Sequence, residues 1–196
     1  MKITKGHWLL VVATITYILG FTTYYVSIKN FEFLWYVLVL VGLALLVGLT
    51  LKKSQFPLWL LSLLSLWGLL HMAGGGIRIN GHVLYAQMIY PFVTNGEWSI
   101  LKYDQLIHAF GFGVTAIVFY FLLSRKVGSL ISPFWLGVTS ICASTGLGAL
   151  NEIIEFGAAV ALSNSGVGGY VNTGLDLISN LTGAVIATVI YSQLKK

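Results

Sequence analysis

Charged residues are scarce in this chain: lysine, arginine, aspartate and glutamate make up 9% of its 196 residues, whereas hydrophobic residues make up 57%. Soluble domains contain about 25% charged residues, so the composition excludes an ordinary water-soluble protein. The mean hydropathy of +0.87 indicates several membrane spans instead. Six spans of about 20 residues each would use most of the chain, which leaves no room for a separate soluble domain.

Cysteine and the common catalytic motifs are scarce as well. Cys142 is the only cysteine, so the chain can build neither a disulfide framework nor a cysteine-based metal site. The sequence contains no HExxH metal motif and no serine-nucleophile elbow. The net charge is +5, but the eleven basic residues are isolated, at most in pairs, between apolar runs. They form no stripe of positive charge, which argues against nucleic acid as a partner.

The long apolar runs predict an all-α fold, a polytopic bundle of about six transmembrane helices in a single domain over residues 1–196. The spans are expected at about residues 8–28, 31–51, 56–73, 105–123, 130–161 and 173–194. Residues 74–104 form the one long connection, which opens with three glycines. Its apolar side chains suit a segment that lies at the membrane surface, re-enters between helices or acts as a lid.

Basic residues predict the orientation of the spans, because short cytoplasmic loops carry more lysine and arginine than outer loops. With both chain ends in the cytoplasm, eight basic residues lie inside: Lys2, Lys5, Lys52, Lys53, Arg125, Lys126, Lys195 and Lys196. Only Lys29, Arg78 and Lys102 lie outside. The long connection therefore lies on the outer side of the membrane.

Ionisable side chains inside a bilayer are costly, so they mark candidate functional sites. Seven polar residues lie near corresponding ends of the later spans: His71, Asp104, His108, Glu152, Glu155, Asp176 and Asn180. Because successive spans run in opposite directions, all seven come to the outer half of the membrane. The orientation was assigned from the basic residues alone, so this convergence is an independent result.

Helical spacing places these polar residues on faces that pack inward. Residues three or four apart share one side of a helix, and small residues in membrane helices mark close packing. Three series combine polar and small side chains: Asp104, His108, Gly111 and Thr115; Ser140, Ser144, Gly148 and Glu152; Asp176, Asn180, Gly183 and Ala187. Together they predict a polar pocket inside the bundle that opens outward.

Four carboxylates in one such pocket need compensation, because like charges repel strongly where the dielectric constant is low. Protonated histidines, the cations Arg78 and Lys102, or a bound divalent metal could balance them. Carboxylates and imidazoles suit Zn²⁺, Mn²⁺ or Fe²⁺. The candidate metal ligands are His71, His108, Glu152 and Asp176.

Four short motifs contain these residues: H-M-A-G-G at 71–75, Y-D-Q-L-I-H at 103–108, E-I-I-E-F at 152–156, and G-Y-V at 169–171 followed by Asp176 and Asn180. In their order and spacing, the chain resembles the YjdF-like family of bacterial and archaeal integral membrane proteins and, more distantly, the VanZ-like family. The resemblance covers about residues 55–190. Two positions depart from it: Gln105 stands where arginine or lysine is usual, and Asn172 with Thr173 where a Trp-Asp pair is common.

The resemblance implies a compact helical protein of the bacterial or archaeal cytoplasmic membrane, with no established activity. The VanZ-like branch implies a link to glycopeptide (teicoplanin) resistance, and hence to the cell envelope.

Three functions fit the predicted pocket. One is a metal-dependent enzyme that acts on a lipid or lipid-linked envelope substrate, with Glu155 or Asp104 as general base. In that enzyme Asn180 would orient the substrate and Arg78 would meet a phosphate headgroup. Another is an ion- or proton-coupled transporter, although the sequence shows no inverted repeat. The last is a structural or partner-binding membrane protein whose buried polar network fixes helix register. The sequence leaves the substrate and the oligomeric state open.

Overall fold

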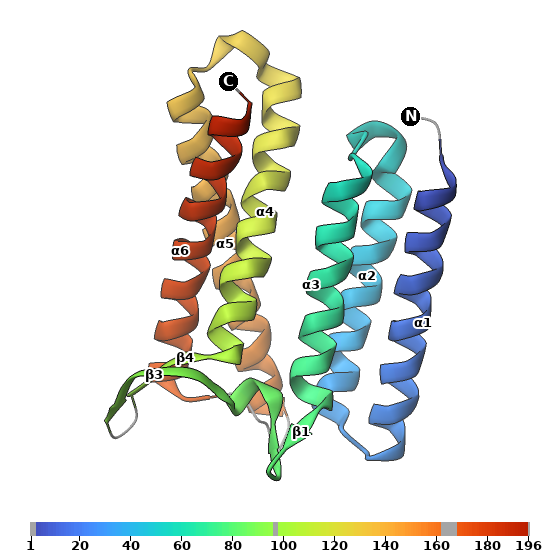
Figure 1. Cartoon of the computed structure of the whole chain (residues 1–196), viewed down its shortest axis with the longest axis vertical. Helices are drawn as coiled ribbons and strands as arrows, with labels where there is room; N and C mark the ends of the chain where they lie inside the picture. Colours follow the sequence, from blue (N-terminus) through green and yellow to red (C-terminus); the bar gives the residue numbers. More distant parts are fainter. Residues whose placement is uncertain (1–2, 96–97, 162–167, 196) are drawn as a thin grey trace. The chain divides into compact units, whose positions relative to one another are not determined.

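The computed structural model describes residues 3–95, 98–161 and 168–195. This part of the chain contains six helices that are long and apolar enough to cross a membrane. They are α1 (Lys5–Ser27), α2 (Phe31–Ser54), α3 (Leu58–Gly76), α4 (Tyr103–Val127), α5 (Pro133–Ala161) and α6 (Tyr170–Leu194) (Figure 1). Helices account for 82% of the structure, which confirms the all-α membrane fold.

Polar signals in the sequence set several helix ends. The Asn30 side chain accepts a hydrogen bond from the Phe33 N–H and so caps the start of α2. Lys52 and Lys53 lie in the last turn of α2, where their positive charge stabilises the helix by interacting with its partly negative carbonyl end. Pro133 is the first residue of α5, a position where its missing N–H costs nothing.

The chain consists of two compact units, Met1–Tyr85 and Ala86–Lys196. In the first unit, α1, α2 and α3 pack through a core that includes the fully buried Tyr25, Leu60 and Met72. The Tyr25 hydroxyl donates a hydrogen bond to the Met72 carbonyl and ties α1 to α3. This unit therefore has a core of its own.

Helix α3 runs three residues further than the sequence predicts. The sequence predicts that Gly74, Gly75 and Gly76 open the long connection. In the structure they form the last turn of α3 and are buried. A Cβ atom at Gly74 would overlap the Tyr85 ring, and one at Gly75 would overlap the Phe33 ring. These glycines are present because aromatic rings pack directly on the helix backbone, a tertiary contact that local sequence does not reveal.

The long connection contains strands, which the sequence analysis did not predict. Strands β1 (Arg78–Ile79) and β2 (His82–Val83) form a short antiparallel hairpin, followed by the 3₁₀ turn η1 (Leu84–Ala86). Strands β3 (Met88–Asn95) and β4 (Trp98–Lys102) form a second antiparallel pair with an irregular register between Met88 and Val93. Isoleucine, tyrosine, phenylalanine and valine favour strands when they lie on a half-exposed surface, and β3 contains all four.

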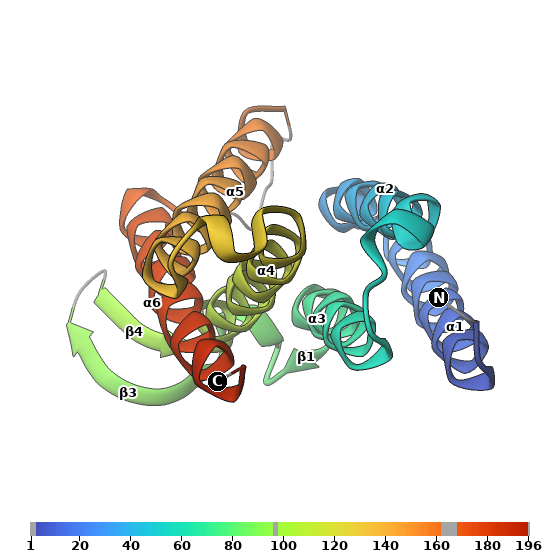
Figure 2. The ribbon, with the colours of Figure 1, turned by 90° about the horizontal axis from the view of Figure 1, so that it is seen from above.

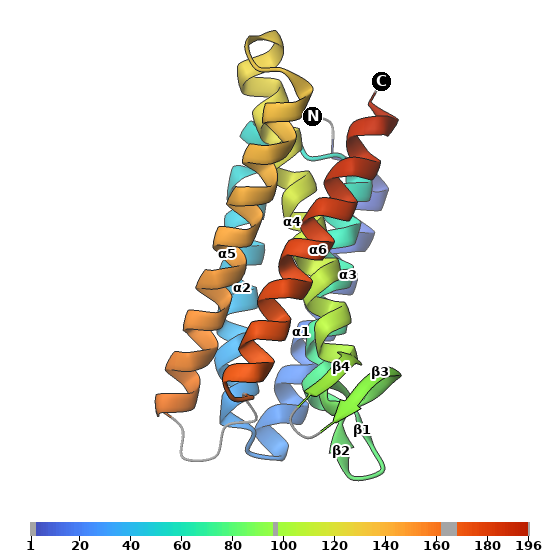
Figure 3. The ribbon, with the colours of Figure 1, turned by 90° about the vertical axis from the view of Figure 1, so that its left-hand side faces the viewer.

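The second unit holds α4, α5 and α6 side by side, with the β3–β4 hairpin at the end where α4 and α6 begin (Figures 1 and 3). Viewed along the helices, α4 and α6 lie against each other and the hairpin extends sideways from them (Figure 2). Gly113 and Gly183 allow this approach: a Cβ at Gly183 would overlap the Ala109 carbonyl, and one at Gly113 would lie 3.0 Å from the Gly183 carbonyl oxygen. The Ser144 hydroxyl donates to the Phe112 carbonyl at 2.6 Å and fixes α5 on α4.

Candidate functional site

Six of the seven predicted polar residues come together at one end of the second unit. Asp104 and His108 lie at the start of α4, Glu152 and Glu155 lie late in α5, and Asp176 and Asn180 lie early in α6. Most residues of the inward faces that helical spacing predicts are buried: His108 and Gly111 on α4, Ser140, Ser144, Gly148 and Glu152 on α5, and Asp176, Asn180 and Gly183 on α6. Asp104, Thr115 and Ala187 are half-buried. A polar cluster inside a helical bundle is the result.

His108 occupies the centre of this cluster, with only 6% of the residue exposed. Its Nε2 atom lies 3.6 Å from Asp104 Oδ1 and 3.8 Å from Glu155 Oε1. Its Nδ1 atom lies 3.5 Å from Glu152 Oε1 and forms a 3.1 Å hydrogen bond with Asn180 Oδ1. The ring therefore faces carboxylates on both sides.

The Asn180 contact determines which ring nitrogen of His108 carries a proton. An amide oxygen can only accept, so Nδ1 must donate to it. A neutral His108 then has its lone pair on Nε2, directed toward Asp104 and Glu155. Gly148 makes room for this arrangement, because a Cβ there would lie 2.7 Å from Asn180 Nδ2.

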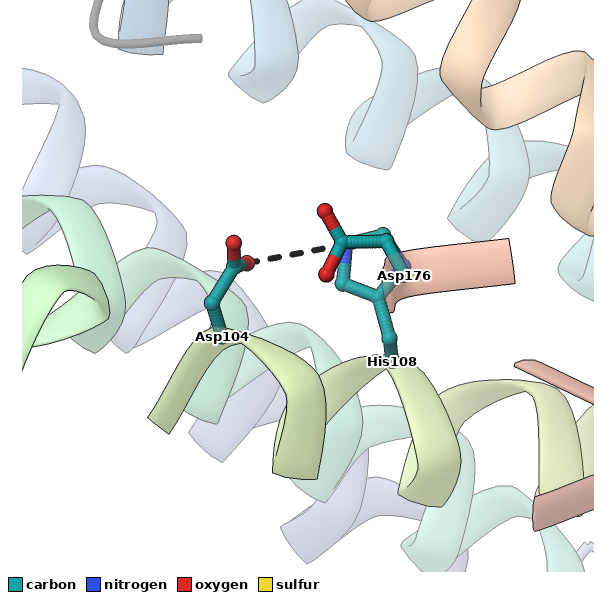
Figure 4. A group of neighbouring side chains, drawn as sticks. All are labelled: Asp104, His108 and Asp176. Atoms are coloured by element: carbon teal, nitrogen blue, oxygen red, sulfur yellow. Dashed lines mark ion pairs between the residues drawn. The ribbon is translucent and has the colours of Figure 1, made fainter. Parts of the chain in front are cut away.

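Asn172 joins the two aspartates. Its side-chain amide donates to Asp104 Oδ2 at 3.3 Å and to Asp176 Oδ2 at 2.5 Å. One oxygen of each carboxylate is thereby held, and Oδ1 of each is left for another partner. Asp104, His108 and Asp176 lie close together, with the Asp104–His108 ion pair drawn as a dashed line (Figure 4).

A second asparagine holds Glu155 in the same way, since Asn151 Nδ2 donates to Glu155 Oε1 at 2.8 Å. The sequence analysis assigned neither Asn151 nor Asn172 a role in the cluster. A usable signal existed, because each asparagine precedes its carboxylate by four residues and therefore shares its helix face.

The cluster has more negative than positive groups. It combines four carboxylates with one imidazole, and in the described part of the chain no lysine or arginine forms an ion pair with any of the four. The side chains of Asp104, Glu152 and Glu155 are 20%, 6% and 15% exposed, so water screens them little. Charge of this kind is stable in a bilayer only with protons or a cation beside it.

Three polar atoms in the cluster are buried without a hydrogen bond: Glu152 Oε1, Asp176 Oδ1 and Asn180 Nδ2. Asp176 and Asn180 are fully buried, and Glu152 is 7% exposed. Buried polar atoms are nearly always bonded in folded proteins, and leaving one without a partner costs about 1–3 kcal/mol. A ligand bound in the cluster would remove this cost.

Two overlapping groups in the cluster could hold a metal ion, Asp104 with His108 and Asp176, and His108 with Glu152 and Glu155. Each residue offers one donor atom, and within a group these atoms lie within 4.8 Å of one another. His108 belongs to both groups, so it is the residue on which any cation site here depends.

The remaining predicted site residues, His71 and Arg78, belong to the first unit. His71 Nδ1 lies 2.5 Å from the Tyr85 hydroxyl, and its ring contacts Phe33, Tyr36 and Trp67. Arg78 is exposed on β1 and donates to the Gly81 carbonyl at 3.3 Å. His71 as a metal ligand and Arg78 as a substrate contact stay predictions.

The family comparison agrees with the membrane architecture. The pattern of one family, described as "Predicted membrane protein (DUF2238)", matches residues 7–196. The chain belongs to this family. The match includes α1 from its third residue, all of α2 to α6 and every residue of the polar cluster, so the cluster lies within the region that defines the family. No curated protein and no solved structure matches the chain.

Proposed function

We propose that this protein is a metal-dependent membrane enzyme that acts on a lipid or lipid-linked substrate of the cell envelope. The observation that carries the proposal is the buried four-carboxylate cluster around His108: Asp176 Oδ1 has no hydrogen bond, and no lysine or arginine of the described residues forms an ion pair with the four carboxylates. A divalent cation would supply the missing positive charge and accept the free oxygen as a ligand.

The favoured ligands are Asp104 Oδ1, His108 Nε2 and Asp176 Oδ1. Asn172 already holds the other oxygen of both aspartates, and Asn180 already holds Nδ1 of the histidine. Metal ligands are typically oriented by hydrogen bonds of this kind to their remaining atoms. The 3.6 Å between His108 Nε2 and Asp104 Oδ1 suits two donors on one ion, since ligands at about 2.1 Å in a tetrahedral site lie about 3.4 Å apart.

These contacts favour a different role for Glu152 than the direct metal ligation that the sequence suggested. Glu152 Oε1 lies 3.5 Å from His108 Nδ1, on the side of the ring away from Asp104. Because the Nδ1 proton is donated to Asn180, Glu152 would act on the ring through its charge, which favours a cation bound at Nε2.

Glu155 is the proposed general base. It lies 3.8 Å from His108 Nε2, and Asn151 fixes the position of its carboxylate. A divalent cation would supply Lewis-acid chemistry, polarising water and an ester or phosphate oxygen. Glu155 would accept the proton that water loses as its oxygen attacks the substrate, and the leaving alcohol would take a proton in turn.

The substrate class rests on location. The cluster lies near one end of membrane-spanning helices, and the basic residues predict that this end is the outer one. A lipid headgroup is the substrate that reaches such a site from the membrane, and Asn180 Nδ2, which is buried without a hydrogen bond, would bind an oxygen of the substrate. Membership of the YjdF-like and VanZ-like families of bacteria and archaea would agree with an envelope substrate.

Metal content tests the site. In purified protein analysed by plasma mass spectrometry, we expect near-stoichiometric zinc, manganese or iron in the wild type and at least a tenfold loss in Asp176→Asn and Asp104→Asn. Glu32→Gln is the matched control, a carboxylate in the first turn of α2, and should keep its metal. Metal absent from a folded wild-type protein, after growth and purification with each ion, would contradict the site.

Turnover tests the reaction. With liposomes that contain phospholipids and a polyprenyl phosphate, we expect metal-dependent release of phosphate or headgroup by the wild type. Glu155→Gln should retain metal and lose turnover at least a hundredfold. If Glu155→Gln keeps both metal and turnover of the same lipid, Glu155 is not the base.

A further inference from the structure

The β3–β4 hairpin has an exposed apolar surface. Tyr90, Phe92 and Trp98 are 58%, 67% and 53% exposed, and Ile89 and Val93 are exposed too. The Tyr90 and Phe92 rings contact each other edge to face, with centroids 4.9 Å apart. In the described part of the hairpin, Lys102 is the one charged residue. A hairpin of this composition is not adapted to face water on all sides.

The sequence of β3 disfavours a second protein strand as the partner of this surface. Exposed strand edges bind other strands through backbone N–H groups, and Pro91 in the middle of β3 has none. The irregular register between Met88 and Val93 further interrupts the strand. Tyrosine and tryptophan, by contrast, are the residues that concentrate where a membrane meets water.

The base of the hairpin is fixed to a membrane-spanning helix. The Gln105 amide oxygen accepts hydrogen bonds from the Leu101 and Lys102 N–H groups at 2.6 and 3.1 Å. The Gln105 amide nitrogen donates to the Ser99 carbonyl, and the Tyr103 N–H donates to the Gln87 carbonyl. Strand β4 thus passes into α4 without a flexible link, so the hairpin stays at the depth where this span begins.

We propose that the β3–β4 hairpin lies in the headgroup layer of the bilayer, with Tyr90, Phe92 and Trp98 among the lipid headgroups and upper acyl chains. An amphipathic element held at that depth gains by burying aromatic side chains in the interface. The hairpin extends sideways from the start of α4 (Figures 2 and 3), and His108 follows five residues after the first residue of that helix. This inference is independent of any metal or enzyme activity.

Fluorescence quenching in proteoliposomes tests the position of the hairpin. In a Cys142→Ser background, a Phe92→Cys variant and an Asn80→Cys control each receive one environment-sensitive label; Asn80 lies in the exposed turn between β1 and β2. Lipids that carry a nitroxide near the headgroup should quench the label at position 92 at least twofold more than aqueous iodide does. The label at position 80 should show the reverse preference.

A native residue provides the second measurement, because a label can itself seek the membrane. The difference in emission between wild type and Trp98→Phe reports on Trp98 alone, and shallow brominated lipids should quench it. Quenching of both probes by iodide only would overturn the proposal, as would concentration-dependent disulfide dimers of Phe92→Cys, which would assign the surface to a second copy. Neither readout depends on metal or turnover, so the two proposals can fail separately.

Discussion

At the scale of single residues, asparagine side chains organise the polar cluster. Asn172, Asn151 and Asn180 each bond to a charged or ionisable group and determine which of its atoms remains available. Hydrogen bonds of this kind are strong when water is excluded, because the buried carboxylate has few other partners. The geometry of the acids is therefore set by neutral residues.

Removing the amide of Asn172 should loosen both aspartates. We expect Asn172→Ala to weaken binding of the divalent cation by about 10–100-fold, the usual effect of losing an orienting contact next to metal ligands. Competition with a chelating dye in detergent measures it. Thr173→Ala, a neighbour on α6 that is half-buried as Asn172 is, serves as the control. Equal affinities for the two variants would show that Asn172 does not position the ligands.

The sequence predicted the ionisable members of the cluster but not their assignments. Asp104, His108 and Asp176 are identifiable because charge within an apolar span is rare. Which nitrogen of His108 faces which carboxylate depends on ring orientation across three helices, and spacing along one helix does not contain that information. The same limit applies to Glu152, whose role depends on the side of the ring that it approaches.

At the scale of elements, glycine determines how closely α4 and α6 pack. Gly113 and Gly183 lie at the contact, and Gly183 meets backbone atoms of α4 directly. Backbone contact of this kind brings the starts of the two helices together, and with them Asp104 and Asp176.

Adding one methyl group at this contact should destabilise the protein. We expect Gly183→Ala to lower the thermal unfolding temperature by several degrees, because the Ala109 backbone cannot move aside and overpacking costs about 1–3 kcal/mol. Gly146→Ala on α5 is the control: its Cβ meets nothing within 4 Å, and alanine is the better helix former. A fluorescence-detected melt in detergent compares them. The prediction is wrong if Gly183→Ala melts no lower than Gly146→Ala.

Most elements were predictable, and the exception has a physical cause. A membrane-spanning helix forms all its backbone hydrogen bonds within one segment, so the length of an apolar run is enough to identify it. In the β3–β4 hairpin, the backbone hydrogen bonds run between two separate segments. The spacing of its apolar residues matches neither a helical nor a strand period, so the sequence does not distinguish this hairpin from a helix at the membrane surface. The sequence does not reveal that Gln105 joins the hairpin to α4, because this role depends on its hydrogen bonds to β4.

At the scale of the whole molecule, the distribution of basic residues defines a testable orientation. The pairs Lys52–Lys53 and Arg125–Lys126 lie in the last turns of α2 and α4, where they also interact favourably with the helix dipoles. Retention of such pairs in the cytoplasm predicts that both chain ends lie inside and that both hairpins lie outside.

Labelling with a membrane-impermeant maleimide in intact cells tests this orientation in the Cys142→Ser background. A cysteine that replaces Asn80 should react at once. One that replaces Ser132, in the connection between α4 and α5, should react only after permeabilisation, and green fluorescent protein fused after Lys196 should fluoresce. The opposite pattern would place the polar cluster near the cytoplasm and remove outer-leaflet lipids as substrates.

Because α4 and α6 are in backbone contact, the residues proposed to bind the cation and the residue proposed as the base lie on parts of the bundle that pack differently. Asp104, His108 and Asp176 all lie on this tightly packed pair, whereas Glu155 lies on α5. A displacement of α5 would move Glu155 away from His108 without changing the distances among the three proposed ligands. Cation retention would then depend on a rigid pair of helices, while admission of a headgroup and alignment of the base would depend on the third.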